Sequence, residues 1–309
     1  MSVNRLIHAR SAYLRYMQMS QASIFILVEG KDLDPFFYGH ICQSVCGPKG
    51  MHYKLCKANE LPPQAGGKTA LIEFYNYLRR KRCLVSVLDG KKTTAIFFLD
   101  KDIDDLSRSL RRSKHIIYTR FYEVHNEVYR HGNLVRGAAC ATSLEETVLS
   151  PLLTDSAKWC AQASRRWQDW LVLCLISARK NVACQRNFGV CSKIQCPKTG
   201  NVNPTLLCEA KSKIAAGLHL SATDFQRLYD SYHARVDRYF RSGRHDIVFR
   251  GKWYPYLLDE DIRLLMGQVK YLKKGFTSKI TSSVASTLDF TDSWTDYYTS
   301  RLQAAIGRD

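Results

Sequence analysis

The sequence has no apolar run of the length that a membrane would require. Its apolar runs, such as Ile24–Val28 and Ala95–Leu99, are strand-sized, whereas a membrane-spanning helix needs roughly 20 apolar residues. The N-terminal segment carries Arg5, Arg10 and Arg15 among its apolar positions, so it lacks the uninterrupted apolar stretch of a secretory signal. We therefore expect no membrane association.

Acidic residues are scarce relative to basic ones. The 309 residues include 46 Lys and Arg against 28 Asp and Glu, which gives a net charge of +18. The hydrophobic content of 45% and charged content of 24% are ordinary for a folded protein with one large or two medium domains. A field of this sign attracts polyanions. Nucleic acid is the first expectation, ahead of an acidic membrane surface or an acidic protein partner.

The spacing of the cysteines gives little support for a disulfide framework or a zinc site. The eleven cysteines are scattered along the chain, which is typical of reduced thiols rather than of a disulfide framework, and we expect a cytoplasmic protein. Cys184, Cys191, Cys196 and Cys208 lack the short Cys-x₂₋₄-Cys spacing of most zinc sites, apart from the loose Cys191-x₄-Cys196 pair. Reduced thiols are therefore favoured over a zinc site.

The first half alternates strand-like and helix-like segments. The continuous apolar run 24–28 is typical of a strand buried on both faces, and 93–99 is predicted as the second strong strand. Further strands are predicted at 51–56 and 116–122, and helices at 33–45 and 68–82. This alternation predicts an open, mostly parallel α/β sheet of Rossmann-like type.

The second half changes character. From about residue 143 helical patterns dominate, with buried helices marked by Trp159, Trp167 and Trp170. We expect an α/β domain at 1–140 and a mainly helical domain at 141–309, with a polar insert at 181–205.

One amphipathic helix in this half carries several arginines. Ser221-Ala-Thr-Asp224 resembles a capping box, so a helix is expected to begin there. Arg235 and Arg238 fall outside its apolar stripe and are expected to face solvent or phosphate. They are our candidate nucleic-acid contacts, together with Lys68, which lies at the predicted N-terminal end of a helix, where anions are favoured. Gly66-Gly67-Lys68 is too short for a Walker A loop, so an energy-using step would need a partner.

The acidic residues stand at the ends of the two buried strands. Glu29 follows the first, and Asp100, Asp102 and Asp104 follow the second. Ligands of open α/β sheets bind beyond the carboxyl ends of the strands. If the two strands are neighbours, Glu29 and Asp100 meet there.

Crowded carboxylates repel one another unless a cation holds them, and an all-oxygen ligand set favours Mg²⁺ or Mn²⁺. Such an ion binds phosphate oxygens and lowers the pKa of an attacking water. The predicted site therefore consists of Glu29, Asp100 and Asp102 as catalytic and metal-binding residues, with Asp104 as a further metal ligand. Glu29 is alternatively a general acid or base.

A strand ending in Glu29-Gly30, followed by a strand ending in Asp100-x-Asp102, resembles the Toprim domain. That domain is shared by type II topoisomerases, bacterial primases, OLD-family nucleases and small RNA-maturation nucleases. The strings VEGKDLDPFFY, GGKTALIEFY, FFLDKDIDD and YTRFYEVHNEVY resemble one OLD-like branch more closely, the AriB nuclease subunits of the PARIS antiphage systems. The resemblance covers about residues 22–130.

The resemblance implies a Toprim fold and a metal-dependent endonuclease. It further implies a toxic effector of antiviral defence, held inactive by an ABC-type ATPase partner and released on infection. The released protein would be a homodimer that cleaves host tRNA.

Several positions depart from the family's pattern. Many Toprim nucleases have a second acid where this chain has Leu33, so Asp32 or Asp34 would have to substitute. The Glu-Asn pair that follows a tyrosine-rich strand in the relatives reads His125-Asn126 here. His125 is either a general base or a histidine held by the backbone. Lys252, in Phe249-Arg-Gly-Lys252, echoes a late Gly-Lys element and is either a phosphate contact or a solvated lysine.

Other functions remain open. A topoisomerase or primase would need further domains, for which 309 residues leave little room. A stand-alone DNA nickase or RNA-processing nuclease is the nearest alternative. From another class, the chain could be a non-catalytic nucleic-acid-binding regulatory module, but crowded acids weaken polyanion binding unless a metal bridges them.

Overall fold

The computed structural model describes residues 9–62, 66–103, 109–182, 194–196, 199–267 and 275–307. The chain divides into two compact units. The first comprises residues 1–101, 110–120 and 290–309, and the second comprises residues 102–109 and 121–289.

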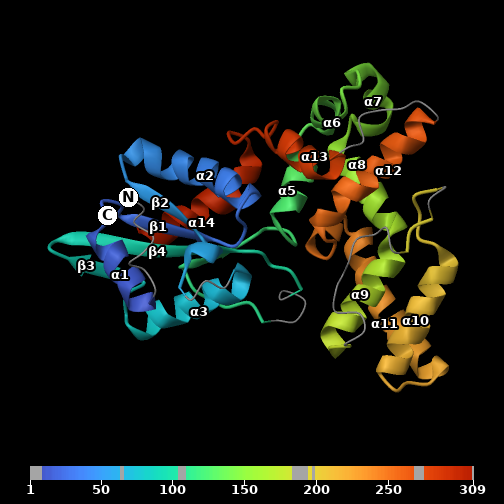
Figure 1. The fold of residues 1–309 in the computed structure, drawn as a ribbon, viewed down its shortest axis with the longest axis horizontal. Coiled ribbons are helices and arrows are strands. Elements are labelled where there is room, and N and C mark those ends of the chain that lie inside the picture. Colours follow the sequence, from blue (N-terminus) through green and yellow to red (C-terminus); the bar gives the residue numbers. More distant parts are fainter. Residues whose placement is uncertain are drawn as a thin grey trace. The chain divides into compact units, whose positions relative to one another are not determined.

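The first unit is built on a sheet whose strands are mostly parallel, as predicted (Figure 1). The strand β1 (Ile24–Val28) pairs in parallel with β2 (Tyr53–Lys57) on one side and with β4 (Lys91–Leu99) on the other. The C-terminal end of β4 pairs in parallel with β5 (Ile116–Tyr118). The parallel strands therefore lie in the order β2-β1-β4-β5, with β1 and β4 at the centre.

Helices cover both faces of this sheet. On one face α1 (Arg10–Met19) and α3 (Gly67–Arg80) pack against side chains of β1 and β4 in the main core cluster. On the other face lie α2 (Leu33–Cys46) and α14 (Asp296–Ile306), joined by aromatic contacts. The Tyr38 ring of α2 stacks on Phe98 of β4 with centroids 4.1 Å apart. Because both faces are covered, all five residues of β1 are buried.

Three features of this unit differ from the prediction. The strand expected at 116–122 ends at Tyr118, since the backbone N–H of Arg120 leaves the sheet and donates to the Tyr298 hydroxyl at 3.0 Å. The strand β3 (Val85–Leu88) was not predicted and pairs antiparallel with the start of β4. The helix α14 returns from the end of the chain to complete a layer of the first unit.

The second unit is helical in the part that the structure describes, as predicted. Helices begin earlier than residue 143, at Val124. They are α5 (Val124–His131), α6 (Leu134–Thr142), α7 (Glu146–Leu153), α8 (Ser156–Arg166), α9 (Gln168–Lys180), α10 (Pro204–Gly217), α11 (Ala222–Arg241), α12 (Tyr254–Met266) and α13 (Phe276–Ala285). The three predicted core tryptophans, Trp159, Trp167 and Trp170, are buried.

The predicted cap at the start of α11 is confirmed, because the Ser221 hydroxyl accepts a hydrogen bond from the Asp224 backbone N–H at 3.1 Å. The compact units do not follow a single cut after residue 140: the change of unit falls at residues 101–102, 109–110, 120–121 and 289–290. Much of the polar insert predicted at 181–205 lies outside the described residues, and α10 begins at its end. Among the described helices, none combines the length and apolar character needed to cross a membrane.

Candidate active site

Glu29 and Asp100 lie together at the carboxyl edge of the sheet in the first unit. They follow the neighbouring parallel strands β1 and β4, in which Val28 stands opposite Phe98. The backbone N–H of Asp100 donates to Oε1 of Glu29 at 2.8 Å. From β1 the chain passes first to β2 on one side and later to β4 on the other, so the switch in strand order falls between β1 and β4. In open α/β sheets this switch is where ligands bind.

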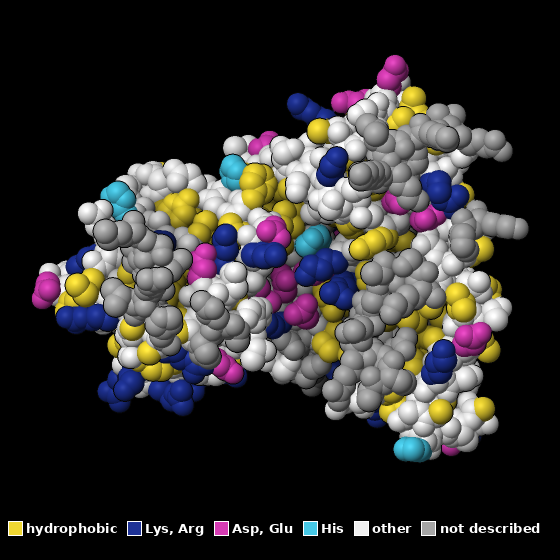
Figure 2. Space-filling view, in the orientation of Figure 1, with side chains coloured by type: hydrophobic (Ala, Val, Ile, Leu, Met, Phe, Trp, Pro, Cys, Tyr) yellow, Lys and Arg dark blue, Asp and Glu magenta, His cyan; other side chains and the backbone are white. Residues whose placement is uncertain are grey.

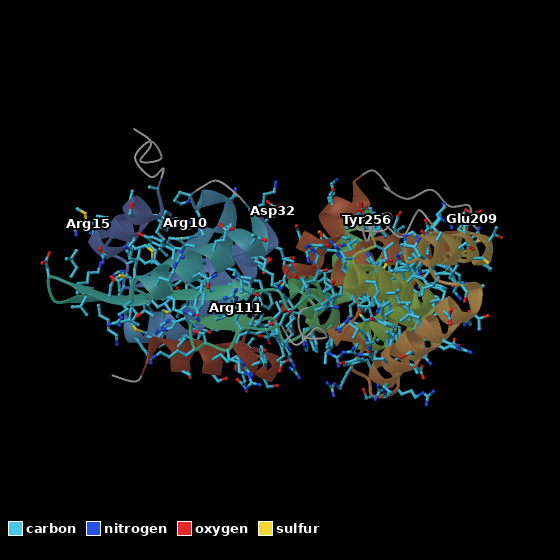
Figure 3. All side chains as sticks on the ribbon, turned by 90° about the horizontal axis from the view of Figure 1, so that it is seen from below. Arg10, Arg15, Asp32, Arg111, Glu209 and Tyr256 are labelled. Carbon is cyan, nitrogen blue, oxygen red and sulfur yellow. The ribbon has the colours of Figure 1, made fainter. Side chains whose placement is uncertain are left out.

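The turn after β1 is fixed by one of the predicted acids. Asp34 is buried, with 8% of its surface exposed, and its Oδ2 accepts a hydrogen bond from the Gly30 backbone N–H at 2.7 Å. A side chain at Gly30 would meet this carboxylate, because a Cβ there would lie 2.7 Å from Oδ1 of Asp34. The glycine and Asp34 together set the direction in which the chain leaves Glu29. Asp34 therefore has a defined place in the turn, whereas Asp32 is exposed at the N-terminal end of α2 (Figure 3).

The turn after β4 is held by contacts with two other segments, the start of α3 and the residues that follow β5. Nζ of Lys68 donates to the carbonyl oxygen of Asp100, and it lies 3.3 Å from that of Lys101. The backbone N–H of Lys101 donates to the Thr119 hydroxyl at 2.9 Å. Nζ of Lys101 in turn donates to the Arg120 carbonyl at 2.9 Å. The ammonium of Lys68, a predicted nucleic-acid contact, is thus positioned at the edge that carries Glu29 and Asp100.

Asp102 is the first residue of the second unit and adopts an unusual backbone conformation. Its φ is +50°, in the left-handed region that aspartate and asparagine tolerate better than most residues. Its backbone N–H donates to the Tyr122 carbonyl at 2.9 Å. One residue, Lys101, separates it from Asp100, and the hydrogen bond to Tyr122 of its own unit holds its backbone. Asp104 lies outside the described residues.

The second unit contains an ion pair between a buried glutamate and an exposed lysine, and the sequence analysis did not predict this pairing. Oε2 of Glu123 lies 3.0 Å from Nζ of Lys252, and Oε1 accepts from the Lys252 backbone N–H at 2.7 Å. Glu123 is 1% exposed. Burial alone would raise the pKa of Glu123, but His125, Lys252 and Arg250 hold it below its ordinary value. The glutamate is therefore charged at neutral pH, and its partner is the lysine singled out in the sequence.

Close backbone packing brings the two ends of this ion pair together. A Cβ at Gly251 would lie 2.6 Å from the Asn126 backbone nitrogen, so only glycine fits there. The side-chain Nδ2 of Asn126 donates to the Phe249 carbonyl at 2.9 Å. Glu123 and Asn126 also form a reciprocal capping box at the start of α5. The Glu123-x-x-Asn126 spacing was the available signal for this role of Glu123.

His125 is neutral at neutral pH. Burial lowers its pKa to about 4, helped by the positive charges of Lys252 and Arg250 and opposed by Glu123. A neutral imidazole accepts a proton, which is compatible with the predicted role as a base. The structure thus groups His125 with Lys252 and Glu123 within the second unit.

The remaining predicted contacts lie on other surfaces. Arg235 is half-buried and Arg238 exposed on α11, and both line a cavity of about 270 Å³. Cys196 is half-buried and Cys208 exposed, while Cys184 and Cys191 lie outside the described residues.

Figure 2 shows Lys and Arg side chains gathered at the lower margin of the first unit, over the end of α3. The exposed basic residues of that segment are Arg79, Arg80, Lys81 and Arg82.

The donor set at the sheet edge suits a hard cation. Glu29 and Asp100 offer carboxylate oxygens, each with more than one lone pair, and Mg²⁺ is commonly bound through one or two carboxylates with water and substrate phosphate completing the shell. Within the described ranges, from which Asp104 is absent, no three His, Cys, Asp or Glu side chains gather in a metal-binding arrangement. In comparisons with known proteins, no family model and no curated protein matches the chain.

Proposed function

We propose that the chain is a metal-dependent endonuclease with a Toprim-type site. The hydrogen bond between Glu29 and the Asp100 backbone carries this proposal, because it joins two acids at the switch between neighbouring parallel strands. The net charge of the chain, +18, supports a polyanionic substrate. Acids at such an edge would repel a phosphodiester by themselves, so their presence in a basic protein favours a bridging cation.

Glu29, Asp100 and Asp102 are the residues proposed to hold Mg²⁺ or Mn²⁺, with Asp104 as a further ligand. The ion would supply charge neutralisation at the scissile phosphate and would lower the pKa of the attacking water. The fixed turns at Gly30 and Lys101 keep the two carboxylates of the first unit in place before substrate binds. Lys68 adds a positive charge at the same edge, where it would attract a phosphate oxygen.

The proposed substrate is tRNA, and the proposed role is that of a toxic effector in antiphage defence. These two points follow from the similarity to the AriB nuclease subunits over residues 22–130. An ABC-type ATPase partner and an active homodimer belong to the same proposal. A stand-alone DNA nickase or RNA-processing nuclease would use the same carboxylates on a different substrate.

The test is induction of the wild-type protein in cells, with and without the ATPase encoded nearest to it, followed by sequencing of RNA ends. We expect growth arrest and discrete tRNA fragments, both lost in the Glu29→Gln variant. Nicked plasmid with intact tRNA would support the DNA alternative. If every nucleic acid stays intact in the presence of Mg²⁺ or Mn²⁺ and of the triggered partner, the endonuclease proposal is wrong.

A non-catalytic nucleic-acid-binding module is the second candidate. The charge of +18 favours it, since that charge supports binding without any chemistry. Binding by such a module would fall steeply with salt and would be indifferent to EDTA. Binding that strengthens on addition of Mg²⁺, and that loses this dependence in Asp100→Asn, would instead favour the metal site.

A further inference from the structure

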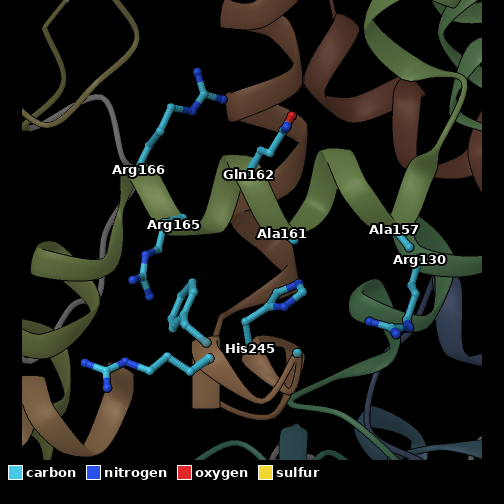
Figure 4. A pocket seen from close by; sticks show the side chains of 10 residues that line it. Arg130, Ala157, Ala161, Gln162, Arg165, Arg166 and His245 are labelled. Atoms are coloured by element: carbon cyan, nitrogen blue, oxygen red, sulfur yellow. The ribbon is translucent and has the colours of Figure 1, made fainter. Parts of the chain in front are cut away.

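We infer that a cavity beneath α8 in the second unit binds a nucleoside phosphate, with the phosphate on arginine side chains and the base against Phe240. The cavity has a volume of about 710 Å³ and lies between α8, the end of α11 and the turn that follows it (Figure 4). Its lining includes Arg130, Arg165, Arg166 and Arg241. The inference is independent of the proposed nuclease activity, because every lining residue belongs to the second unit.

Buried aspartates hold the arginines in position. Arg165 and Arg241 share Asp237, with Nη1 of Arg165 at 2.8 Å from Oδ1 and Nη2 of Arg241 at 2.5 Å from Oδ2. Nη1 of Arg130 lies 2.6 Å from Oδ2 of Asp246, which is fully buried. Each guanidinium has five N–H donors, so these contacts leave further donors on every group. A guanidinium fixed in this way binds phosphate with little loss of side-chain entropy.

The charge of this cluster suits a phosphate. Arg166 is bound through both terminal nitrogens to Asp261, at 2.7 Å for each contact, and extends to the other side of α8 in Figure 4. The four arginines are thus balanced by three aspartates, which leaves one positive charge in excess. The aspartates are absent from the cavity lining. A ligand therefore meets the arginines and not their carboxylate partners.

A buried histidine nitrogen supplies the second observation. His245 is 3% exposed and lines the cavity. Among the described residues its Nε2 has no hydrogen-bond partner, although Oδ2 of Asp246 lies 3.5 Å away. In Figure 4 its ring lies between Arg165 and Arg130. A buried polar atom without a partner is costly, and a phosphate or ribose oxygen in the cavity would supply that partner.

The shape of the cavity provides room for a flat group. Ala157 and Ala161 are four residues apart on α8 and present small side chains to the cavity, and Gly243 presents none. The Phe240 ring lies beside them, with Cζ of Arg165 at 5.4 Å from its centroid. Aromatic rings stack on bases of any sequence. The volume is within the roughly 300–1,000 Å³ typical of sites for small ligands.

Two sources offer this ligand chemistry, a free nucleotide and a nucleotide of a nucleic-acid strand. The experiment is isothermal titration of the full chain with AMP, with adenosine, with inorganic phosphate and with a ten-nucleotide single-stranded RNA. We expect saturable AMP binding that weakens about tenfold or more for adenosine or phosphate alone, since each lacks one half of the recognised group. Tighter binding of the RNA than of AMP, weakened by a substitution in the cavity, would identify the strand as the source, and tighter binding of AMP would identify the free nucleotide.

Two variants locate the ligand in the cavity. Ala161→Trp narrows it without removing a charge, and Arg165→Ala removes a guanidinium whose side chain is 51% exposed, so both should fold. Both are expected to lower affinity for AMP or RNA about tenfold or more, whereas Lys158→Ala, an exposed residue of α8 outside the lining, should leave it unchanged. Arg130 is unsuitable because its loss would strand the buried Asp246.

Affinities that Ala161→Trp and Arg165→Ala leave unchanged would overturn the inference, as would equal affinity for adenosine and AMP. Because binding is measured without cleavage, a protein that proves not to be a nuclease still tests this cavity. Equally, a loss of cleavage in Glu29→Gln would say nothing against nucleotide binding here.

Discussion

The backbone N–H of Asp100 donates a hydrogen bond to Oε1 of Glu29 at 2.8 Å, although the two residues are 71 positions apart in the chain. The bond makes the Glu29 side chain part of the turn that presents Asp100. A substitution that keeps an oxygen at Oε1 therefore separates the structural role of Glu29 from its charge.

We predict that Glu29→Gln folds normally and loses nuclease activity. The glutamine carbonyl still accepts from the Asp100 N–H, so the free energy of unfolding should change by less than about 1 kcal/mol. Activity should fall roughly a hundredfold or more, the scale expected when a group that stabilises charge in the transition state is lost. Cleavage of labelled RNA and urea unfolding measure the two effects.

Asp100→Asn is the companion variant, and Asp89→Asn is its matched control. Asp89 is exposed in the turn before β4 with φ +52°, where asparagine is well tolerated. Wild-type protein and Asp89→Asn should both show a higher melting temperature in Mg²⁺ or Mn²⁺, because an ion that binds the folded state stabilises it. Asp100→Asn should lose that increase. An equal increase in all three proteins would argue against a metal on Asp100.

The positive φ of Asp102 allows backbone strain to be distinguished from carboxylate chemistry. Asp102→Gly should be at least as stable as the wild type, and Asp102→Asn should be close to it. Asp102→Ala should lower the free energy of unfolding by about 1–2 kcal/mol, because alanine is strained in the left-handed region. All three should lack metal-dependent activity. Urea unfolding orders the stabilities, and cleavage assays compare the activities. Full activity in Asp102→Asn would remove this residue from the proposed metal site.

The sequence predicted the centre of the sheet well, for a physical reason. A strand buried on both faces leaves a continuous apolar run, and both β1 and β4 carry one, so Glu29 and Asp100 could be assigned to strand ends. Local pattern also held the signal for β3, since Asp89-Gly90 is a typical hairpin turn. That signal was overlooked.

Other features depend on contacts that no local pattern encodes. The helix α14 joins the first unit because Trp294, just before the helix, stacks on Phe37 and Tyr298 of the helix contacts the same ring, more than 250 positions earlier in the chain. The pairing of Glu123 with Lys252 likewise joins positions 129 apart. Sequence spacing identified Lys252 as a candidate but could not show that a buried glutamate binds it.

The ion pair of Glu123 and Lys252 predicts a strong coupling between the two positions. Lys252→Met should destabilise the protein by roughly 1–3 kcal/mol, less than for a fully buried pair because the lysine side chain is 48% exposed. Glu123→Gln in the same chain should recover most of this loss, since no buried charge then lacks a partner. A double-mutant cycle from urea unfolding measures the coupling, and simple additivity of the two changes would contradict it.

His125 predicts a loss of stability in mild acid. Its pKa in the folded protein is about 4, below the ordinary value of 6.5, because burial and the charges of Lys252 and Arg250 disfavour the protonated ring. The unfolded chain therefore binds the proton first, and the stability present above pH 6.5 is lost as pH falls toward 4. Between pH 7.5 and pH 5 this residue should account for about 2 kcal/mol. Urea unfolding of the wild type and of His125→Gln at both pH values measures this contribution, because carboxylates that do not interact with His125 contribute equally to both proteins. The stability of the wild type relative to His125→Gln should be lower at pH 5 than at pH 7.5 by that amount, and a relative stability independent of pH would show that folding leaves the pKa of His125 unchanged.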